Sequence, residues 1–170
     1  YVSGFMGATM EHTSTEIPLL RGDAGFAQEV TEGPGGDTLP LCYQCGTCTG
    51  CCPVGAVDDA FSPALIIQWI RLGLRERVLG SPKIWLCLQC HRCSFSCPQG
   101  VRFADINGTL RHMAVREGFV DAATAEKLAA VEKDLAALRC AVLERAMGKD
   151  LNTTPSTDEL VREALRDLHG

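Results

Sequence analysis

The chain has 170 residues, a formal net charge of −5 and 46% hydrophobic residues. This length indicates one domain with appendages, and the acidic balance argues against a nucleic-acid-binding surface. The most apolar stretch, ALIIQWIRLGL, is interrupted by Gln68 and Arg71, so the sequence predicts no membrane span and we expect a soluble protein.

Residues 1–40 contain seven glycines and three prolines and show no sustained helical or strand periodicity. This composition predicts an extended N-terminal arm. Two alternatives stay open for it, a disordered tail and an arm that becomes ordered against a neighbouring protein of a complex.

Two similar cysteine runs follow, CYQCGTCTGCCPVG at residues 42–55 and CLQCHRCSFSCPQG at residues 87–100. They agree at seven of fourteen positions, and each reads CxxCxxCxxxCP. The chain therefore contains an internal repeat. Its candidate ligands are Cys42, Cys45, Cys48 and Cys52 in the first run, and Cys87, Cys90, Cys93 and Cys97 in the second.

This run is typical of bacterial ferredoxins, in which three cysteines hold one [4Fe–4S] cluster and the fourth ligates the other cluster. Two residues between thiolates let one loop curl around a face of the cube. Pro53 and Pro98 then turn the chain, so that the fourth cysteine can reach across. We therefore expect two [4Fe–4S] clusters, the first on Cys42, Cys45, Cys48 and Cys97, and the second on Cys87, Cys90, Cys93 and Cys52.

Three other chemistries fit only part of this pattern. Ten cysteines could form the disulfides of a secreted protein, but disulfides do not require the regular spacing of metal ligands. The observed spacing therefore argues for reduced thiols and a cytoplasmic location. Residues 87–91 also read CxxCH, a c-type haem signal, but haem leaves Cys93, Cys97 and the first run unexplained. One zinc ion needs four thiolates, and the two runs supply eight. No signal peptide is apparent, although the sequence starts at Tyr1.

Two further cysteines fall outside the repeat. Cys51 aligns with Ser96, so we expect a small residue near the cluster rather than a ligand. The adjacent Cys51 and Cys52 resemble part of the motif in the B subunit of heterodisulfide reductase, which also requires an earlier cysteine, and none precedes Cys42. Cys140 is predicted to be a buried apolar thiol.

Helical patterns fill most of the remaining chain. Ser62 before Pro63 predicts a helix start, and a stripe of apolar residues continues until Gly80. A second helix is expected after the second run, ending at Gly118. The first stripe is Leu65, Ile66, Trp69, Ile70 and Leu74, and the second is Phe103, Ile106, Leu110 and Ala114. Both stripes predict an apolar core that covers the clusters. Trp69 and Trp85 are expected to shield iron from water.

A long helix is predicted from Asp121, as its N-cap, to Met147, and a short one after the linker GKDLNTTPST. The long helix carries Leu128, Val131, Leu135, Leu138 and Val142 at alternating steps of three and four. Two explanations of this stripe stay open, packing within the chain and docking on a neighbouring protein of a complex. The short helix carries Leu160, Ala164 and Leu168 on one side.

Thirty-four residues separate Cys52 from Cys87, whereas the small strand-bearing ferredoxin has a shorter interval. This helical insertion resembles the all-α ferredoxin module in the iron–sulfur subunit of succinate dehydrogenase and fumarate reductase. We therefore expect an all-α fold, with an extended arm at residues 1–40, an α-helical ferredoxin domain binding two clusters at 41–120, and a C-terminal helical extension at 121–170.

One asymmetry between the runs bears on electron flow. His91 and Arg92 replace Gly46 and Thr47, so a positive charge in the second loop is expected to raise the potential of its cluster and place it downstream. The alternative is that Arg92 faces solvent or pairs with a carboxylate of a partner.

The two cysteine runs, the helical insertion and the RFADINGTLRHMAVREG segment resemble the C subunit of heterodisulfide reductase over residues 38–120, including the C subunits of bacterial complexes tied to sulfur oxidation. That resemblance implies an electron-transfer subunit of a hetero-oligomer, which symmetry can double. Its two clusters would relay electrons between a flavin-containing A subunit and a catalytic B subunit that carries out thiol–disulfide chemistry. No residue of this chain would be an acid–base catalyst.

Other functions stay open at this point. The chain would also suit the iron–sulfur subunit of another flavin oxidoreductase, of the succinate, fumarate or glycolate type. A catalytic subunit with its own substrate and an iron–sulfur redox sensor are further alternatives. The electron donor, the acceptor, the direction of flow and the cluster potentials do not follow from the sequence.

Overall fold

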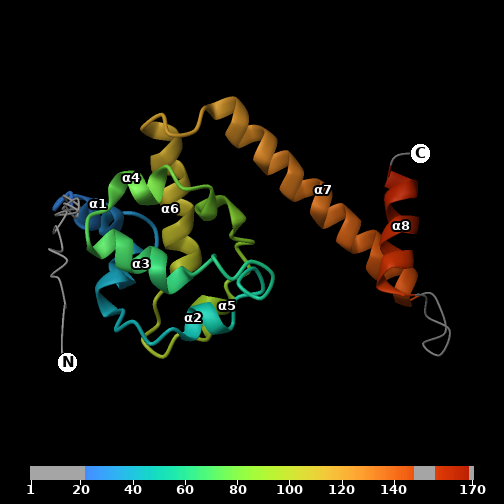
Figure 1. The fold of residues 1–170 in the computed structure, drawn as a ribbon, viewed down its shortest axis with the longest axis horizontal. Helices are drawn as coiled ribbons and strands as arrows, with labels where there is room; N and C mark the ends of the chain where they lie inside the picture. Colours follow the sequence, from blue (N-terminus) through green and yellow to red (C-terminus); the bar gives the residue numbers. More distant parts are fainter. Residues whose placement is uncertain (1–21, 148–155, 169–170) are drawn as a thin grey trace, which may run out of the picture.

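The computed structural model describes residues 22–147 and 156–168. Every regular element in these ranges is helical, which confirms the all-α expectation for the described chain. In chain order they are α1 (Phe26–Glu32), the 3-10 helix η1 (Gly36–Leu41), α2 (Thr47–Gly50), α3 (Pro63–Arg71), α4 (Arg75–Leu79), the 3-10 helix η2 (Pro82–Leu86), α5 (Arg92–Phe95), α6 (Phe103–Arg116), α7 (Ala122–Met147) and α8 (Thr157–Leu168). Helices α1 to α6 form a globular part, from which α7 leads away to α8 (Figure 1).

Helix α6 forms the centre of the core. Its predicted apolar face is buried throughout, since Phe103, Ile106, Leu110 and Ala114 are each at most 1% exposed. The helix ends as expected before Gly118, whose φ of 77° lies in the left-handed region. Helix α6 therefore supplies the surface on which α1, α4, α5 and the two 3-10 helices pack.

The predicted helix between the cysteine runs is interrupted. It begins as expected, because the Ser62 hydroxyl accepts a hydrogen bond from the backbone N–H of Leu65 at 3.2 Å. It stops at Arg71, however, and α4 covers only the last part before Gly80. Gly73 has a φ of 71°, and a Cβ there would lie 2.4 Å from the carbonyl oxygen of Asp23. The close approach of the N-terminal segment thus requires a glycine turn, which breaks the helix.

The N-terminal region also differs from its expected extended form. Residues 26–41 form α1 and η1 against the core, with Phe26 and Val30 fully buried and Leu39 only 2% exposed. Two helical turns are too short to show a clear periodicity, and the surrounding glycines resemble the composition of a loop. Residues 1–21 lie outside the described residues, and the division of the chain into three regions stays a prediction.

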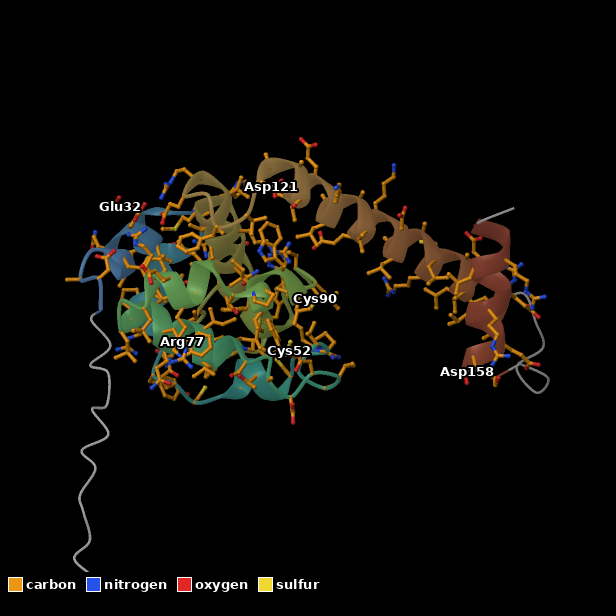
Figure 2. The ribbon with its side chains drawn as sticks, turned by 45° about the horizontal axis from the view of Figure 1, so that its top comes forward. Glu32, Cys52, Arg77, Cys90, Asp121 and Asp158 are labelled. Carbon is orange, nitrogen blue, oxygen red and sulfur yellow. The ribbon has the colours of Figure 1, made fainter. Side chains whose placement is uncertain are left out.

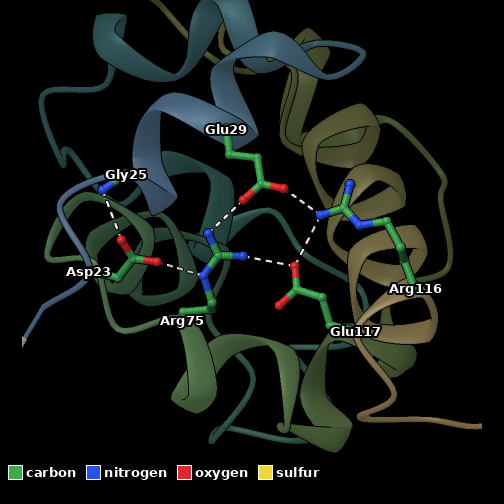
Figure 3. A network of polar contacts seen from close by, with 6 residues as sticks. All are labelled: Asp23, Gly25, Glu29, Arg75, Arg116 and Glu117. Carbon is green, nitrogen blue, oxygen red and sulfur yellow. Dashed lines mark hydrogen bonds and ion pairs between the residues drawn. The ribbon is translucent and has the colours of Figure 1, made fainter.

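Arg75 of α4 anchors this N-terminal segment (Figure 3). Its guanidinium contacts Asp23 Oδ2 at 2.7 Å, Glu29 Oε2 at 2.5 Å and Glu117 Oε1 at 2.7 Å. Arg116 bridges Glu29 and Glu117 from the other side. Hydrogen bonds from Arg75 hold the pKa of both Asp23 and Glu29 below their ordinary values. One ion-pair network therefore joins the N-terminal segment, α4 and the end of α6.

Helix α7 begins as predicted, because Asp121 Oδ1 accepts a hydrogen bond from the backbone N–H of Thr124 at 2.8 Å. Its apolar stripe is only partly covered. Helix α8 packs on the far end of α7 and buries Leu160, whereas Val131 and Leu135 are 51% and 56% exposed. Packing within the described chain therefore explains only the C-terminal part of the stripe.

Cys140 of α7 is exposed, so the prediction of a buried thiol is wrong. Helix α7 leaves the globular part (Figure 1), and the Cys140 side chain stays exposed among the described residues. Residues 148–155 of the following linker lie outside the described ranges. No described helix combines the length and apolarity that crossing a bilayer requires.

Replacing Arg75 by alanine should lower the free energy of unfolding by about 2 kcal/mol, because three carboxylates lose their shared cation. Anaerobic urea denaturation measures this loss. Arg77→Ala is a matched control on the same helix, where the guanidinium lies 4.3 Å from the centroid of the Trp69 ring. That single contact predicts a loss of only about 0.5–1 kcal/mol. Equal losses in the two variants would contradict the anchoring role of Arg75.

Candidate metal centre

The sequence repeat is also a repeat of backbone conformation. Gln44 and Gln89 have φ values of 64° and 52°, and Gly46 and His91, two residues later, have 80° and 57°. Left-handed conformations are costly for glutamine and histidine, and such strain is concentrated at functional sites. A loop in which every second residue is left-handed curls, and its backbone N–H groups point into a concave surface that binds anionic groups. Each run then enters a single helical turn, α2 or α5, and these two turns pack together.

The predicted ligands surround two cavities. One is lined by the cysteines expected around the first cluster, Cys42, Cys45, Cys48 and Cys97. The other is lined by those expected around the second cluster, Cys52, Cys87, Cys90 and Cys93. The last cysteine of each run therefore lies in the cavity of the other run. Figure 2 shows Cys52 and Cys90, from different runs, on the same side of the globular part.

The space between the lining atoms, open solvent included, is about 390 Å³ at the first cavity and about 310 Å³ at the second. Among the described residues, no three His, Cys, Asp or Glu side chains converge on the position of one metal ion. The thiols instead surround a wider space, and thiolate ligands are those that iron–sulfur clusters prefer. The donor set of four cysteines at each cavity thus fits an iron–sulfur cube.

Apolar side chains complete the cavity walls. The first cavity is bounded by Ala64 and Ile67 of α3, and the second by Val54 and Phe61. Phe103, at the start of α6, lines both cavities and is 1% exposed. A single aromatic ring therefore forms part of the wall between the two sites, and the surrounding carbon atoms limit the access of water.

The thiols differ in exposure. Cys45 and Cys90, the second cysteine of each run, are exposed, whereas Cys87 and Cys93 are each 8% exposed. Burial raises the pKa of the Cys93 thiol to about 11 and raises that of Cys87. These buried thiols must lose their protons to bind iron. One cysteine of each cavity therefore reaches the surface, and the second cavity also has two largely buried cysteines.

Arginines contact the first cysteine of each run, and the sequence analysis missed both contacts. Arg71 Nη1 donates to the carbonyl oxygen of Cys42 at 2.8 Å, and Arg111 Nη2 donates to that of Cys87 at 2.6 Å. Arg71 is exposed, but the side chain of Arg111 is only 14% exposed. The signal for Arg111 was its position four residues after Asn107, at the edge of the buried face of α6. The side chains of Asn107 and Arg111 both donate to the carbonyl oxygen of Ile84.

The remaining candidates have less direct positions. Arg92 is exposed on α5, whereas His91 lines the second cavity, with its Nδ1 3.8 Å from Asp105 Oδ1. Cys51 is half-buried next to Cys52 and is absent from the described lining of both cavities.

Trp69 and Trp85 were expected to shield the clusters from water. Neither residue belongs to the lining of either described cavity. Each indole instead packs beneath a guanidinium, that of Arg77 on Trp69 and that of Arg111 on Trp85. Their rings therefore contact cations, while smaller aliphatic side chains and phenylalanines cover the cavities.

Residues 41–102 match the family model of a 4Fe-4S dicluster domain. This range contains both cysteine runs and the helical insertion between them. The match shows similarity to an iron–sulfur-binding domain, and the two clusters that its name implies agree in number with the two cavities.

Curated proteins give a consistent result. The chain is 30% identical over 98 residues to the C subunit of the H(2):CoB-CoM heterodisulfide,ferredoxin reductase of Methanothermobacter thermautotrophicus, covering 58% of this chain and 52% of the relative. It is 41% identical over 81 residues to an iron–sulfur C subunit, numbered C 2, of the CoB--CoM heterodisulfide reductase of Methanocaldococcus jannaschii, covering 48% and 42%. A longer match of 29% over 140 residues joins it to an Archaeoglobus profundus protein described as similar to the heterodisulfide reductase C subunit, covering 82% and 74%.

The chain spans about half the length of the first two of these relatives. The resemblance expected from the doubled cysteine motif is confirmed. Over about half of its length, this chain is a homologue of the iron–sulfur C subunits of heterodisulfide reductases, with a 4Fe-4S dicluster domain at its centre.

Proposed function

We propose that this chain is an electron relay. Two [4Fe–4S] clusters would carry electrons between a flavin-containing A subunit and a catalytic B subunit that performs thiol–disulfide chemistry. The observation that carries this proposal is the pair of cysteine-lined cavities that share Phe103 as a wall and each have one exposed cysteine. Such an arrangement suits electrons that enter at one cluster and leave from the other.

The ligand assignment is part of the proposal. Cys42, Cys45, Cys48 and Cys97 would hold the first cluster, and Cys87, Cys90, Cys93 and Cys52 the second. The grouping of the same cysteines around separate cavities supports this exchange of the fourth ligand. When bound, each cluster supplies one-electron exchange. The residues of this chain hold the clusters, exclude water from them and keep them adjacent.

Exposed apolar side chains support an assembly with other subunits. Leu41 and Tyr43 adjoin the first cavity and are 51% and 58% exposed, and Leu88 adjoins the second and is 59% exposed. The uncovered stripe of α7 offers another contact surface, because extended apolar surface commonly marks a protein interface. The proposal also includes association with the A and B subunits and a role in sulfur metabolism, which the resemblance to heterodisulfide reductase C subunits implies. It includes a cytoplasmic location, which the reduced thiols favour.

Anaerobically purified chain should contain about eight irons and show two interacting [4Fe–4S] signals by electron paramagnetic resonance (EPR). Cys52→Ser should then damage the cluster held chiefly by residues 87–93, because an alkoxide or hydroxyl is a poorer ligand than a thiolate. Cys97→Ser should damage the cluster of residues 42–48 for the same reason.

Cys51→Ser is the matched control for Cys52→Ser, since it changes the adjacent thiol and should leave both EPR signals intact. Damage to the first cluster in Cys52→Ser would contradict the exchange of ligands. One zinc ion per chain, or native material without iron, would contradict the relay itself.

The shared wall gives a separate prediction. Phe103→Leu should leave a gap between the cavities and make both clusters bleach faster in air, because oxygen and water gain access to them. The loss of each cluster's EPR signal with time in air measures the two rates, and Phe95→Leu is the control, since Phe95 is 90% exposed. Faster decay of one cluster alone would show that Phe103 does not shield both.

A further inference from the structure

The two cysteine loops are built alike but differ in the position of a nearby positive charge. An arginine donates to the first cysteine's carbonyl oxygen in both loops, Arg71 to Cys42 and Arg111 to Cys87. Arg71 is exposed at the end of α3, whereas the Arg111 side chain is 14% exposed. The arginine that contacts the first loop is therefore surrounded by solvent, whereas the one that contacts the second loop is largely buried.

Arg111 is held rigidly in this position. Its Nε donates to the Ile84 carbonyl oxygen at 3.0 Å, and its Nη2 donates to Trp85 O at 3.1 Å and Cys87 O at 2.6 Å. The guanidinium also lies over the Trp85 ring, 5.4 Å from its centroid. These contacts bind the planar group to the end of η2 and fix its distance from the second cavity.

One carboxylate opposes this charge. Arg111 Nη1 contacts Glu132 Oε1 at 3.0 Å, and Glu132 lies on α7 with 51% of its side chain exposed. Water screens an exposed carboxylate more than a buried guanidinium, so the pair keeps a net positive field on its buried side.

A cluster gains one electron, and hence one negative charge, when it is reduced. A nearby fixed cation therefore stabilises the reduced form and raises the reduction potential, and it does so more strongly where solvent screening is weak.

We propose that Arg111 is a positioning residue that raises the potential of the second cluster relative to the first, and that Glu132 moderates this effect from α7. The inference rests on the proposed two-cluster relay and assigns to Arg111 the role that the sequence suggested for Arg92. It makes the second cluster the electron acceptor of the pair. It also links the position of the long helix α7 to the electrostatics of that cluster.

Redox titration followed by EPR tests this assignment on the full chain with both clusters bound. Cys90→Ser, which alters a proposed ligand of the second cluster, identifies the signal of that cluster. At a fixed potential, Arg111→Gln should then lower the ratio of reduced to oxidised second cluster about tenfold. This equals a fall of about 59 mV in its midpoint potential. The first cluster should stay within about twofold of its original ratio.

Arg71→Gln is the matched control, since it removes the equivalent hydrogen bond from an exposed guanidinium, and both clusters should stay within about twofold. Glu132→Gln should shift the second cluster in the opposite direction, toward reduced, by less than Arg111→Gln does. Arg111→Lys should retain part of the effect, because the charge persists without the planar fork.

The outcomes separate the two proposals. Native chain without two [4Fe–4S] clusters would overturn the relay. Two intact clusters with an unmoved second potential in Arg111→Gln would overturn the role of Arg111 and leave the relay standing. An equal shift in Arg71→Gln, or a Glu132→Gln shift in the same direction as Arg111→Gln, would show that lost hydrogen bonds or altered packing move the potentials instead of charge.

Discussion

The two cysteine loops interlock, because the last cysteine of each loop lies in the wall of the cavity that the other loop forms. Neither cavity is complete without both loops. This mutual dependence requires two segments separated by thirty-four residues to lie side by side. The helices of the insertion, α3 and α4, and the central helix α6 satisfy that requirement by packing their apolar faces together and placing Phe103 between the cavities.

The remaining elements support this centre from outside. Helix α1 and η1 close one side of the core, and the ion pairs of Arg75 bind them to α4 and to the end of α6 (Figure 3). The network joins segments far apart in the chain, so it fixes their relative positions as well as adding stability. Helix α7 instead extends into solvent, with Val131 and Leu135 uncovered. The described chain therefore combines a globular part that contains two cysteine-lined cavities with a projecting helix, α7, at its C-terminal side.

The centre has nearly two-fold repetition in its backbone but not in its electrostatic surroundings. The loops share their left-handed residues and an arginine contact on the first cysteine, yet only Arg111 is largely buried. A repeated scaffold that differs in one buried charge can hold two similar cofactors at unequal potentials. In an electron relay, such a difference biases which of the two cofactors holds the electron, whereas the terminal donor and acceptor set the direction of transfer.

From the sequence alone, we predicted the candidate thiolate ligands, their grouping into two runs and the buried face of α6, because cysteine spacing and helical periodicity are local properties of the chain. The sequence also predicted the caps at Ser62 and Asp121, which depend on a few neighbouring residues. It did not reveal α1, the break at Gly73 or the exposure of Cys140, since each depends on which distant segment lies against it. The contact between Arg111 and Cys87 followed only from the tertiary structure, because the two residues lie 24 positions apart in sequence and no local pattern brings them together.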